Sequence, residues 1–452
     1  MHPWIGAGAE DRARILAEIG KGSVDQLFSQ LPQSVQVGAV GVPEALDEAS
    51  LLTYLEGLAG ENLTLDDMPS FLGAGVYRHV QPAAVDAVLG RAEFFTSYTP
   101  YQPEISQGTL QVIFEFQTII CQLTGLEVAN ASLYDGATAV VEAALMAHRI
   151  HRGRRDRILV AETVHPVYRR VLNTYADALG LEVETVPLSE DARLDGCALV
   201  AAVGEDVCGV VVQSPNFLGV IEDLPAAAAA AHGCGAIAIQ VVAEAASLGV
   251  LKGGGALGFD IVCGEAQSFG IPAGFGGPHL GFFACREEHV RQMPGRLVGE
   301  TVDAEGRRGF CLTLSTREQH IRRAKATSNI CTNHGLMALA ATVWLELLGG
   351  SGLCALANSC LSRAAWLRER VATIGGGWRL AYPGSAVFNE MLLLGPGSGP
   401  ELVERMADEG VLAGVPSRLW GGSWPDGLLV AVTERSSRHE LEALVAAMGR
   451  VR

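Results

Sequence analysis

The sequence predicts an α/β fold in which a large domain, built on a mostly parallel sheet, precedes a smaller C-terminal α+β domain. From about Gly108, short runs of nearly continuous apolar residues alternate with segments at helical spacing. Strands of a parallel sheet have this character because helices bury both of its faces. The length of 452 residues suits two or three domains. With 49% hydrophobic and 18% charged residues, the chain can fill large cores.

The first part of the chain, residues 1–92, predicts helices and irregular structure without a strand pattern. Ser23 is followed three residues later by Gln26, which matches a capping box and predicts a helix start before Leu27. Residues 47–58 predict another helix. We expect residues 1–92 to form a helical arm or cap.

Residues 93–330 predict the large α/β domain. A helix is expected at 108–123, where Gly125 follows as a stop signal. Strands are expected at 126–131, 157–161, 182–186, 207–213, 236–242, 260–263 and 280–285, with helices at 137–148, 166–179 and 224–232 between them. Ligands of such sheets bind beyond the carboxyl ends of the strands.

Residues 331–452 predict the smaller domain. Helices are expected at 334–347, 353–372, 400–408 and 438–448, and strands at 391–394 and 428–431. This mixture of elements is typical of an α+β domain.

The charge and hydropathy of the chain exclude several classes of partner. A formal net charge of −17 argues against nucleic acid, which requires clustered positive charge. Residues 1–20 carry acids and no apolar stretch after a basic start, so no signal peptide is predicted. Residues 225–251 are apolar but are interrupted by His232, Glu244 and glycines, and they predict a helix, a turn and a buried strand. We expect a cytoplasmic protein with no membrane partner.

The cysteines and histidines predict no metal site. The ten cysteines include no Cys-x-x-Cys pair, which disfavours a zinc site or a disulfide framework. His148 and His151 lie three apart on a predicted helix and could face one metal ion. No further ligand lies nearby, so we expect ordinary surface histidines.

Two short motifs match known sequence signatures, but the secondary structure predicted around them does not fit those signatures. Residues 253–258 match the dinucleotide fingerprint, but these glycines precede a strand instead of opening a helix, so they predict a loop. Residues 266–270 resemble a nucleophile elbow, which requires a helix after the serine. The dense prolines and glycines that follow cannot start one, so a serine hydrolase is disfavoured.

Two polar segments are candidates for binding. Residues 134–139 open a predicted helix, and they predict either an anion site at the helix N-terminus or an ordinary cap by Asp135. The loop 97–108 is more distinctive, because it places Tyr98, Tyr101, Glu104 and Gln107 between prolines. A stiff loop rich in polar aromatic residues suits a binding site, with a packed structural loop as the alternative.

Several of these stretches together resemble the P-protein of the glycine cleavage system, and specifically the N-terminal half of that family. The matching stretches are 70–77 (SFLGAGVY), 95–108 (FTSYTPYQPEISQG), 264–272 (GEAQSFGIP), 276–279 (GGPH), 316–323 (TREQHIRR) and 325–331 (KATSNIC). The resemblance covers nearly the whole chain. In some organisms the two similar halves of this enzyme are separate subunits, and 452 residues suit one half.

The resemblance implies the fold type I architecture of pyridoxal-phosphate-dependent transferases. It also implies a reaction: glycine is decarboxylated with pyridoxal phosphate as electron sink, and the aminomethyl group passes to the lipoyl arm of the H-protein. The expected partners are therefore a homologous, cofactor-bearing second subunit, the lipoylated H-protein and glycine.

The lysine that would bind the cofactor covalently is missing. The chain has three lysines, Lys21, Lys252 and Lys325. In the cofactor-binding half of the family, the lysine stands in a His-Lys-Thr-Phe stretch before Ile-Pro and glycines. Gln267 occupies that place here, and an amide nitrogen is not nucleophilic. We expect no cofactor on this chain and no catalytic residues of its own.

Two more positions follow from the resemblance. Fold type I enzymes hold the pyridine nitrogen of the cofactor with an aspartate, and Glu244 stands near that place. His165 resembles the ring-stacking position. Because active sites of this fold lie between two chains, Tyr98, Tyr101, Glu104 and Gln107 are the candidates for a shared site. The alternatives are a self-sufficient enzyme that uses Lys252, and a non-catalytic scaffold subunit.

Overall fold

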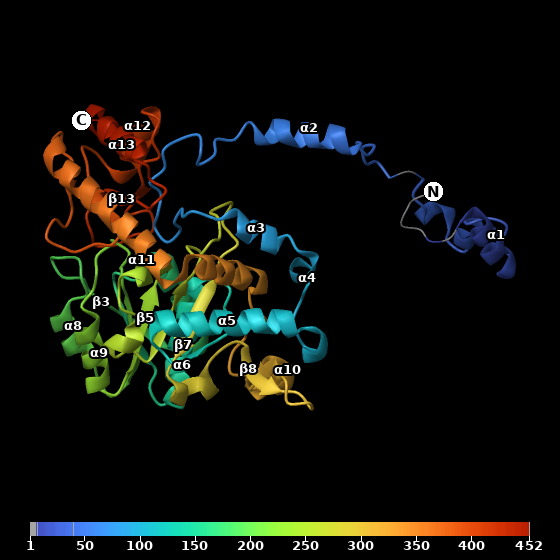
Figure 1. The fold of residues 1–452 in the computed structure, drawn as a ribbon, viewed down its shortest axis with the longest axis horizontal. Helices are drawn as coiled ribbons and strands as arrows, with labels where there is room; N and C mark the ends of the chain where they lie inside the picture. The colour runs from blue at the N-terminus through green and yellow to red at the C-terminus, as the bar shows by residue number, and fades with distance from the viewer. Residues whose placement is uncertain (1–5, 7, 39, 452) are drawn as a thin grey trace. The chain divides into compact units, whose positions relative to one another are not determined.

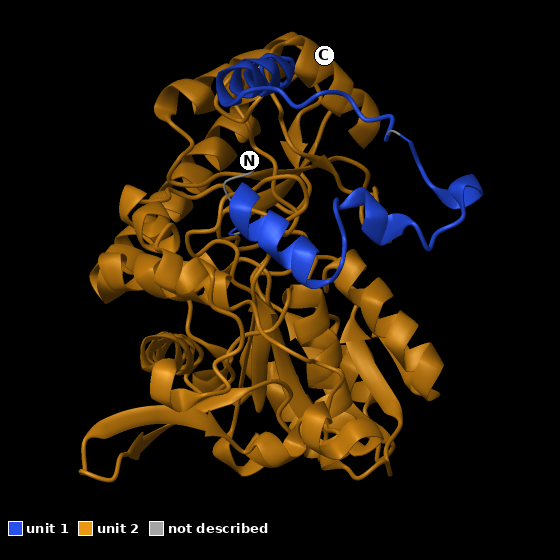
Figure 2. Ribbon diagram, turned by 90° about the vertical axis from the view of Figure 1, so that its right-hand side faces the viewer, with its two compact units in different colours: residues 1–63 blue, residues 64–452 orange. Residues whose placement is uncertain are grey.

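The computed structural model describes residues 6, 8–38 and 40–451, and it divides the chain into two compact units, residues 1–63 and 64–452 (Figure 2). The first unit holds helices α1 (Ala9–Glu18) and α2 (Glu48–Ala59) and the 3-10 helices η1 (Asp25–Phe28) and η2 (Gln33–Val35). The helix expected after Ser23 is only the short η1, because the amide oxygen of Gln26 accepts from Gly22 N at 2.7 Å instead of closing a capping box.

The segment 64–92, which we expected in the arm, belongs to the second unit. Phe71 N donates to Leu412 O at 2.8 Å, and Phe71 O accepts from Ala431 N at 3.0 Å. The segment therefore pairs with the C-terminal part of the chain before it forms helix α3 (Ala83–Leu89).

The larger sheet of the second unit has seven strands in the order β1-β7-β6-β5-β4-β2-β3. Neighbouring strands from β6 to β3 are parallel, whereas β7 runs antiparallel to both β6 and β1. The strands are β1 (Val128–Ala129), β2 (Arg157–Ala161), β3 (Glu182–Val186), β4 (Val207–Gln213), β5 (Ile237–Val242), β6 (Ile261–Glu265) and β7 (Gly281–Cys285). The predicted mostly parallel sheet is confirmed.

Helices cover both faces of this sheet. Along β2, Ile158 and Val160 pack in the core that contains α6 (Gly136–Ile150) and α7 (Pro166–Leu179). Leu159 packs in the core on the other face, with residues of α5 (Gln107–Thr124), α8 (Gly196–Ala202) and α9 (Leu224–Gly233). The alternation follows from the two-residue period of a strand. It explains why the strands are apolar throughout.

A four-stranded antiparallel sheet in the order β10-β11-β13-β12 forms the C-terminal part of this unit. Figure 1 shows β13 together with α12 and α13, away from the strands of the larger sheet. A separate core around Trp378 and Trp424 fills this part. The elements are β10 (Arg379–Leu380), β11 (Glu390–Leu394), α12 (Gly399–Asp408), β12 (Val415–Pro416), β13 (Leu428–Ala431) and α13 (Arg438–Arg450).

Helix α11 (Gly335–Ile374) contains both helices expected at 334–347 and 353–372, and a break at Gly349, with φ of +60°, separates them. Its first half packs Trp344 in the larger core, and its second half packs Leu367 in the smaller one. Within the described residues, α11 is the one helix long and apolar enough to cross a membrane by length and composition. Its buried residues contribute to both protein cores.

The hairpin of β8 (Leu297–Val302) and β9 (Arg308–Thr313) was not expected from the sequence. The carboxylate of Asp303 closes its turn by accepting from Arg307 N at 2.8 Å. The other short elements are α4 (Ala92–Phe95), η3 (Pro103–Ile105), η4 (Ala245–Gly249), η5 (Gly254–Leu257), η6 (Glu287–Gln292), η7 (Ser315–Arg317), α10 (Gln319–Arg322) and η8 (Arg323–Lys325).

Candidate functional site

Gln267 lies directly after β6, at the carboxyl edge of the sheet, where ligands of such folds bind. Its side chain is buried and fully hydrogen-bonded. Nε2 donates to Tyr77 O at 3.0 Å and to Ile271 O at 2.5 Å, and Oε1 accepts from Tyr77 N at 2.9 Å. The amide therefore pairs with the backbone of Tyr77 in the way that a neighbouring strand would.

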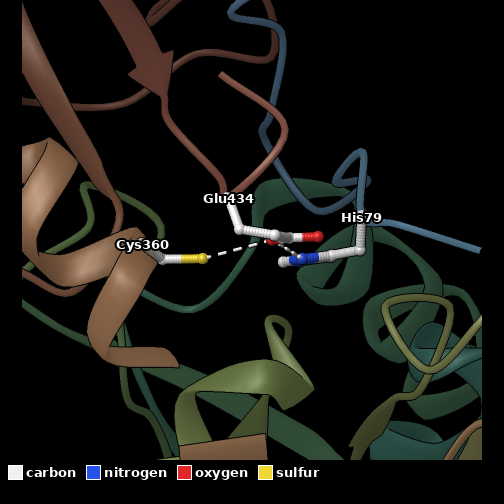
Figure 3. Close-up of side chains that lie close together, drawn as sticks. All are labelled: His79, Cys360 and Glu434. Carbon is white, nitrogen blue, oxygen red and sulfur yellow. Dashed lines mark hydrogen bonds and ion pairs between the residues drawn. The ribbon is translucent and has the colours of Figure 1, made fainter. Parts of the chain in front are cut away.

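Glu244 follows β5 at the same edge and is also engaged. Oε1 accepts from Ala246 N at 2.9 Å, and Oε2 lies 3.3 Å from His79 Nε2. The other ring nitrogen of His79 lies 2.8 Å from Glu434 Oε2 (Figure 3). Burial alone would lower the pKa of His79, but the charges and hydrogen bonds of the two glutamates outweigh it and raise this pKa to about 10. A protonated imidazole thus fills the position opposite Glu244.

The N-terminus of α6 faces a carboxylate of the same chain. Asp135 caps the helix by accepting from Thr138 N at 2.7 Å, so the cap, one of the two alternatives left open by the sequence, is present. Gly136 N donates to Glu265 Oε2 at 3.0 Å, while Glu265 Oε1 accepts from Gln267 N and Leu280 N at 3.0 and 2.9 Å. The helix N-terminus therefore has an anion, and that anion is the buried Glu265.

His165 forms the N-cap of α7 and is held as a neutral ring. Nε2 lies 2.8 Å from Ala74 O, and Nδ1 accepts from Val167 N at 3.2 Å. Burial lowers the pKa of His165 to about 4. A Cβ atom added to Gly75, whose φ is +101°, would lie 2.9 Å from His165 Nε2. Only glycine fits where the backbone passes this ring.

One stretch of chain, residues 73–79, contacts three of these residues, and we refer to it as the 73–79 segment. It meets His165 at Ala74, Gln267 at Tyr77 and Glu244 at His79. Glu390 of β11 fixes it further, because its carboxylate accepts from Ala74 N at 2.6 Å and from the Tyr77 hydroxyl at 2.8 Å. The 73–79 segment therefore lies across His165, Gln267 and Glu244, the three residues that the resemblance places at the cofactor positions.

A pocket of about 460 Å³ remains beside this segment, lined by His165, Tyr168, Glu265, His279 and Trp420 among others. The space is large enough for a small ligand. However, the residues do not fit pyridoxal phosphate: Gln267 has no amine, Glu244 is paired with a cation, and a carboxylate stands at the helix N-terminus where a phosphate would bind.

The loop 97–108, which we call the tyrosine-proline loop, is a second, separate surface. Tyr98, Tyr101 and Glu104 are exposed, and the structure gives them no contact with Gln267 within the described residues. Gln107 is half-buried and binds its own chain: Nε2 donates to Phe310 O at 2.8 Å, and Oε1 accepts from Phe310 N at 2.9 Å. Of the four candidates, Gln107 is thus already engaged in holding α5 against β9.

Arg296 contacts this loop through Tyr101 and Thr99, a role that was not predicted from the sequence. Its guanidinium lies over the ring of Tyr101 at 5.4 Å and donates to the Tyr101 hydroxyl at 3.2 Å. It also donates to Thr99 and Thr332 and lies 3.5 Å from Glu318. The arginine is buried, so it holds the exposed face of Tyr101 in one orientation.

Within the second unit, neither Lys252 nor Lys325 has a described hydrogen bond or ion pair with the 73–79 segment. Lys252 is exposed, and the adjacent Gly253 packs against the backbone of Leu123 and Thr124 at the end of α5. Lys21 belongs to the first unit, and Lys325 is exposed in η8. His148 and His151 do not join a group of three metal-ligating side chains, because the one such group in the described residues is His79, Cys360 and Glu434.

The strand order, the two covered faces and the edge site define the fold type I class of pyridoxal-phosphate-dependent enzymes. A sphingosine-1-phosphate lyase of Burkholderia pseudomallei shares the fold with a TM-score of 0.64 at 18% identity, over 93% of this chain and 94% of that one. The predicted architecture is confirmed.

The chain belongs to the glycine cleavage system P-protein family, whose profile matches residues 2–448. It is 51% identical over 429 residues to a probable glycine dehydrogenase (decarboxylating) subunit 1 of Anaeromyxobacter dehalogenans (strain 2CP-C), covering 94% of this chain and 95% of that protein. The crystal structure of a glycine decarboxylase (P-protein) of the glycine cleavage system, in inhibitor-bound form, matches with a TM-score of 0.89 and 44% identity over 99% of this chain and 100% of that one.

Proposed function

We propose that this chain is subunit 1 of a two-subunit glycine decarboxylase and that pyridoxal phosphate is carried by the homologous second subunit. The pair decarboxylates glycine and passes the aminomethyl group to the lipoyl group of the H-protein. The observation that carries the proposal is the pairing of Gln267 with Tyr77, which replaces the required amine by an amide that is fully used in holding the chain.

The surface of the chain supports a permanent partner. Among the described residues of the first unit, only Leu16 is buried, and α2 buries none of its side chains. In the second unit, Phe95, Tyr98 and Ile105 are exposed by 54%, 78% and 81%. Large apolar side chains exposed in this number are typical of an obligate subunit interface.

We infer that the tyrosine-proline loop contributes to the active site of the partner. The hydroxyl of Tyr101 accepts from Arg296, so its own hydrogen is available for a group outside the chain. Glu104 adds an exposed carboxylate on the same loop. A rigid loop that presents a hydroxyl donor and an acid can bind and orient a small zwitterion such as glycine.

Reconstitution tests the proposal. The purified chain alone, supplied with glycine, pyridoxal phosphate and lipoylated H-protein, is expected to release no CO2, because it lacks the amine. Addition of the second subunit is expected to restore turnover. Turnover by the chain alone would favour a self-sufficient enzyme that uses Lys252.

The scaffold alternative differs in one respect. A scaffold subunit would restore turnover without contributing a side chain to the reaction. Substitutions in the tyrosine-proline loop that leave the complex intact separate the two, as described in the Discussion.

A further inference from the structure

A second cluster of chemically active side chains lies behind the 73–79 segment. His79 ends that segment, Cys360 lies on α11, and Glu434 follows β13 (Figure 3). One ligand-capable atom from each lies within 4.8 Å of the other two. Figure 3 shows Glu434 between the other two side chains. His79 Nδ1 and Cys360 Sγ both face the same carboxylate oxygen, Glu434 Oε2, at 2.8 and 3.5 Å.

The orientation of each group is fixed by bonds outside the cluster. Glu434 Oε1 accepts from Val80 N at 2.6 Å, which directs Oε2 towards His79 and Cys360. The second ring nitrogen of His79 lies 3.3 Å from the Glu244 carboxylate. Metal-bound histidines almost always donate their other ring N–H to such a group. The ligands and the support for the histidine ligand are therefore both in place.

We propose that His79 Nδ1, Cys360 Sγ and Glu434 Oε2 bind one zinc-like divalent cation, with Glu244 holding the ring of His79. Nitrogen, thiolate and carboxylate together are a donor set that zinc accepts. With bonds of about 2.0–2.3 Å, the ligand atoms of a tetrahedral zinc site lie about 3.3–3.6 Å apart. The separations in the structure, 2.8 and 3.5 Å to Glu434 Oε2 and at most 4.8 Å between any two ligand atoms, bracket this range, and a water molecule would supply the fourth ligand.

The charge of the cluster favours an exchange of protons for the cation. Without metal, both ring nitrogens of His79 face carboxylates, those of Glu434 and Glu244, and Cys360 carries a free thiol. Binding releases one proton from Nδ1 of His79 and one from Sγ of Cys360, and two positive charges take their place. The net charge of the buried cluster is unchanged, so no uncompensated charge is created.

The position indicates a structural role for the cation. Cys360 packs in the larger core, Glu434 follows β13 of the smaller sheet, and His79 belongs to the 73–79 segment. A cation here ties these three parts together, beside but outside the pocket that contains His165. This inference does not depend on the proposed function, because the chain can be tested alone.

Metal titration of the full-length chain tests the site. After removal of metals with a chelator, the chain is expected to bind one Zn²⁺ or Co²⁺ per molecule with a rise in the unfolding midpoint. Co²⁺ is expected to give the near-ultraviolet absorption of a cobalt–thiolate bond. Cys360→Ser should abolish that absorption and weaken affinity more than about tenfold. Cys354→Ser, on an exposed thiol of the same helix, should change neither.

A second variant keeps the test decisive if Cys360→Ser folds poorly. Glu434→Gln retains the acceptor for Val80 N and removes the charged ligand, so it should weaken Zn²⁺ binding by a similar factor. No stoichiometric binding by the wild-type chain would overturn the proposal. Cobalt binding without a thiolate band, or with affinity unchanged in both variants, would also overturn it.

Discussion

The side-chain amide of Gln267 pairs with the backbone of Tyr77 in both directions, donating to its carbonyl at 3.0 Å and accepting from its N–H at 2.9 Å. The hydroxyl of the same tyrosine donates to Glu390 at 2.8 Å. Only a group that both donates and accepts can serve at position 267. A lysine can donate but cannot accept, so the glutamine is suited to the 73–79 segment and not to a cofactor.

Gln267→Lys should destabilise the chain and should not produce activity by itself. The buried N–H of Tyr77 loses its acceptor, and an ammonium group must be desolvated, so the free energy of unfolding should fall by about 2–4 kcal/mol. Urea unfolding measures this. Gln81→Lys, at a partly exposed glutamine near the segment, is the control. Glycine decarboxylation by the single variant without a partner would show that the site had kept the remaining cofactor contacts.

The buried Glu390 should make stability depend on pH. Burial raises the pKa of its carboxyl to about 7, against the opposing effect of the bonds from Ala74 N and the Tyr77 hydroxyl. Between its ordinary value of 4.5 and about 7, the unfolded chain binds fewer protons at this group than the folded chain. The contribution of Glu390 to the free energy of unfolding therefore falls as pH rises from 4.5 to about 7, by up to about 3 kcal/mol.

Glu390→Gln isolates that contribution. The variant keeps an acceptor for Ala74 N and a polar partner for Tyr77 but has no proton to lose. Unfolding free energies of both proteins, measured from pH 5 to pH 8, should differ in slope, with the wild type losing more stability. Parallel curves would contradict the assignment of a neutral carboxyl to Glu390.

Tyr98→Phe and Tyr101→Phe should reduce turnover of the two-subunit complex without preventing assembly. Each change removes one hydroxyl and keeps the ring. If a hydroxyl stabilises charge only as CO2 departs, kcat and kcat/KM fall together, by about 2–4 kcal/mol of transition-state stabilisation. Tyr175→Phe, an exposed tyrosine on α7, is the matched control. Full activity in both loop variants, with an intact complex, would favour the scaffold alternative.

A charge among the exposed apolar side chains of the tyrosine-proline loop should weaken assembly of the two subunits. Ile105 is exposed by 81% in η3, within the tyrosine-proline loop. Ile105→Asp should raise the dissociation constant of the pair, because a carboxylate must be desolvated at the interface. Val200→Asp, on the exposed face of α8, should leave it unchanged. Analytical ultracentrifugation measures both, and equal affinities would place the interface elsewhere.

Much of the fold follows from local pattern. Strands β2, β3, β4 and β13 and helix α7 have the bounds that apolar runs and caps predict. The hairpin β8–β9 was missed because the last three residues of β8, Glu-Thr-Val, are all exposed. They do not alternate between buried and exposed positions, which is the pattern that predicts a strand. After Ser23 the chain forms only the short 3-10 helix η1, and the expected capping box is absent because the amide oxygen of Gln26 accepts from Gly22 N.

The site was less predictable because its partners are distant in the chain. Gln267 was identified as the position of the missing lysine, but its partner Tyr77 is 190 residues away. Glu390 is 313 residues from Tyr77, and no local signal links them. His79, Cys360 and Glu434 have no ligand spacing in sequence, so the expectation of no metal site rested on local motifs alone.

Borohydride trapping tests the central claim most directly. The purified chain, and separately the two-subunit complex, are mixed with pyridoxal phosphate, reduced, digested and mapped by mass spectrometry. The account predicts no stoichiometric pyridoxyl adduct on Lys21, Lys252 or Lys325 of this chain, and one adduct per complex on a lysine of the second subunit. A stoichiometric adduct on any of the three lysines, Lys252 above all, would contradict it.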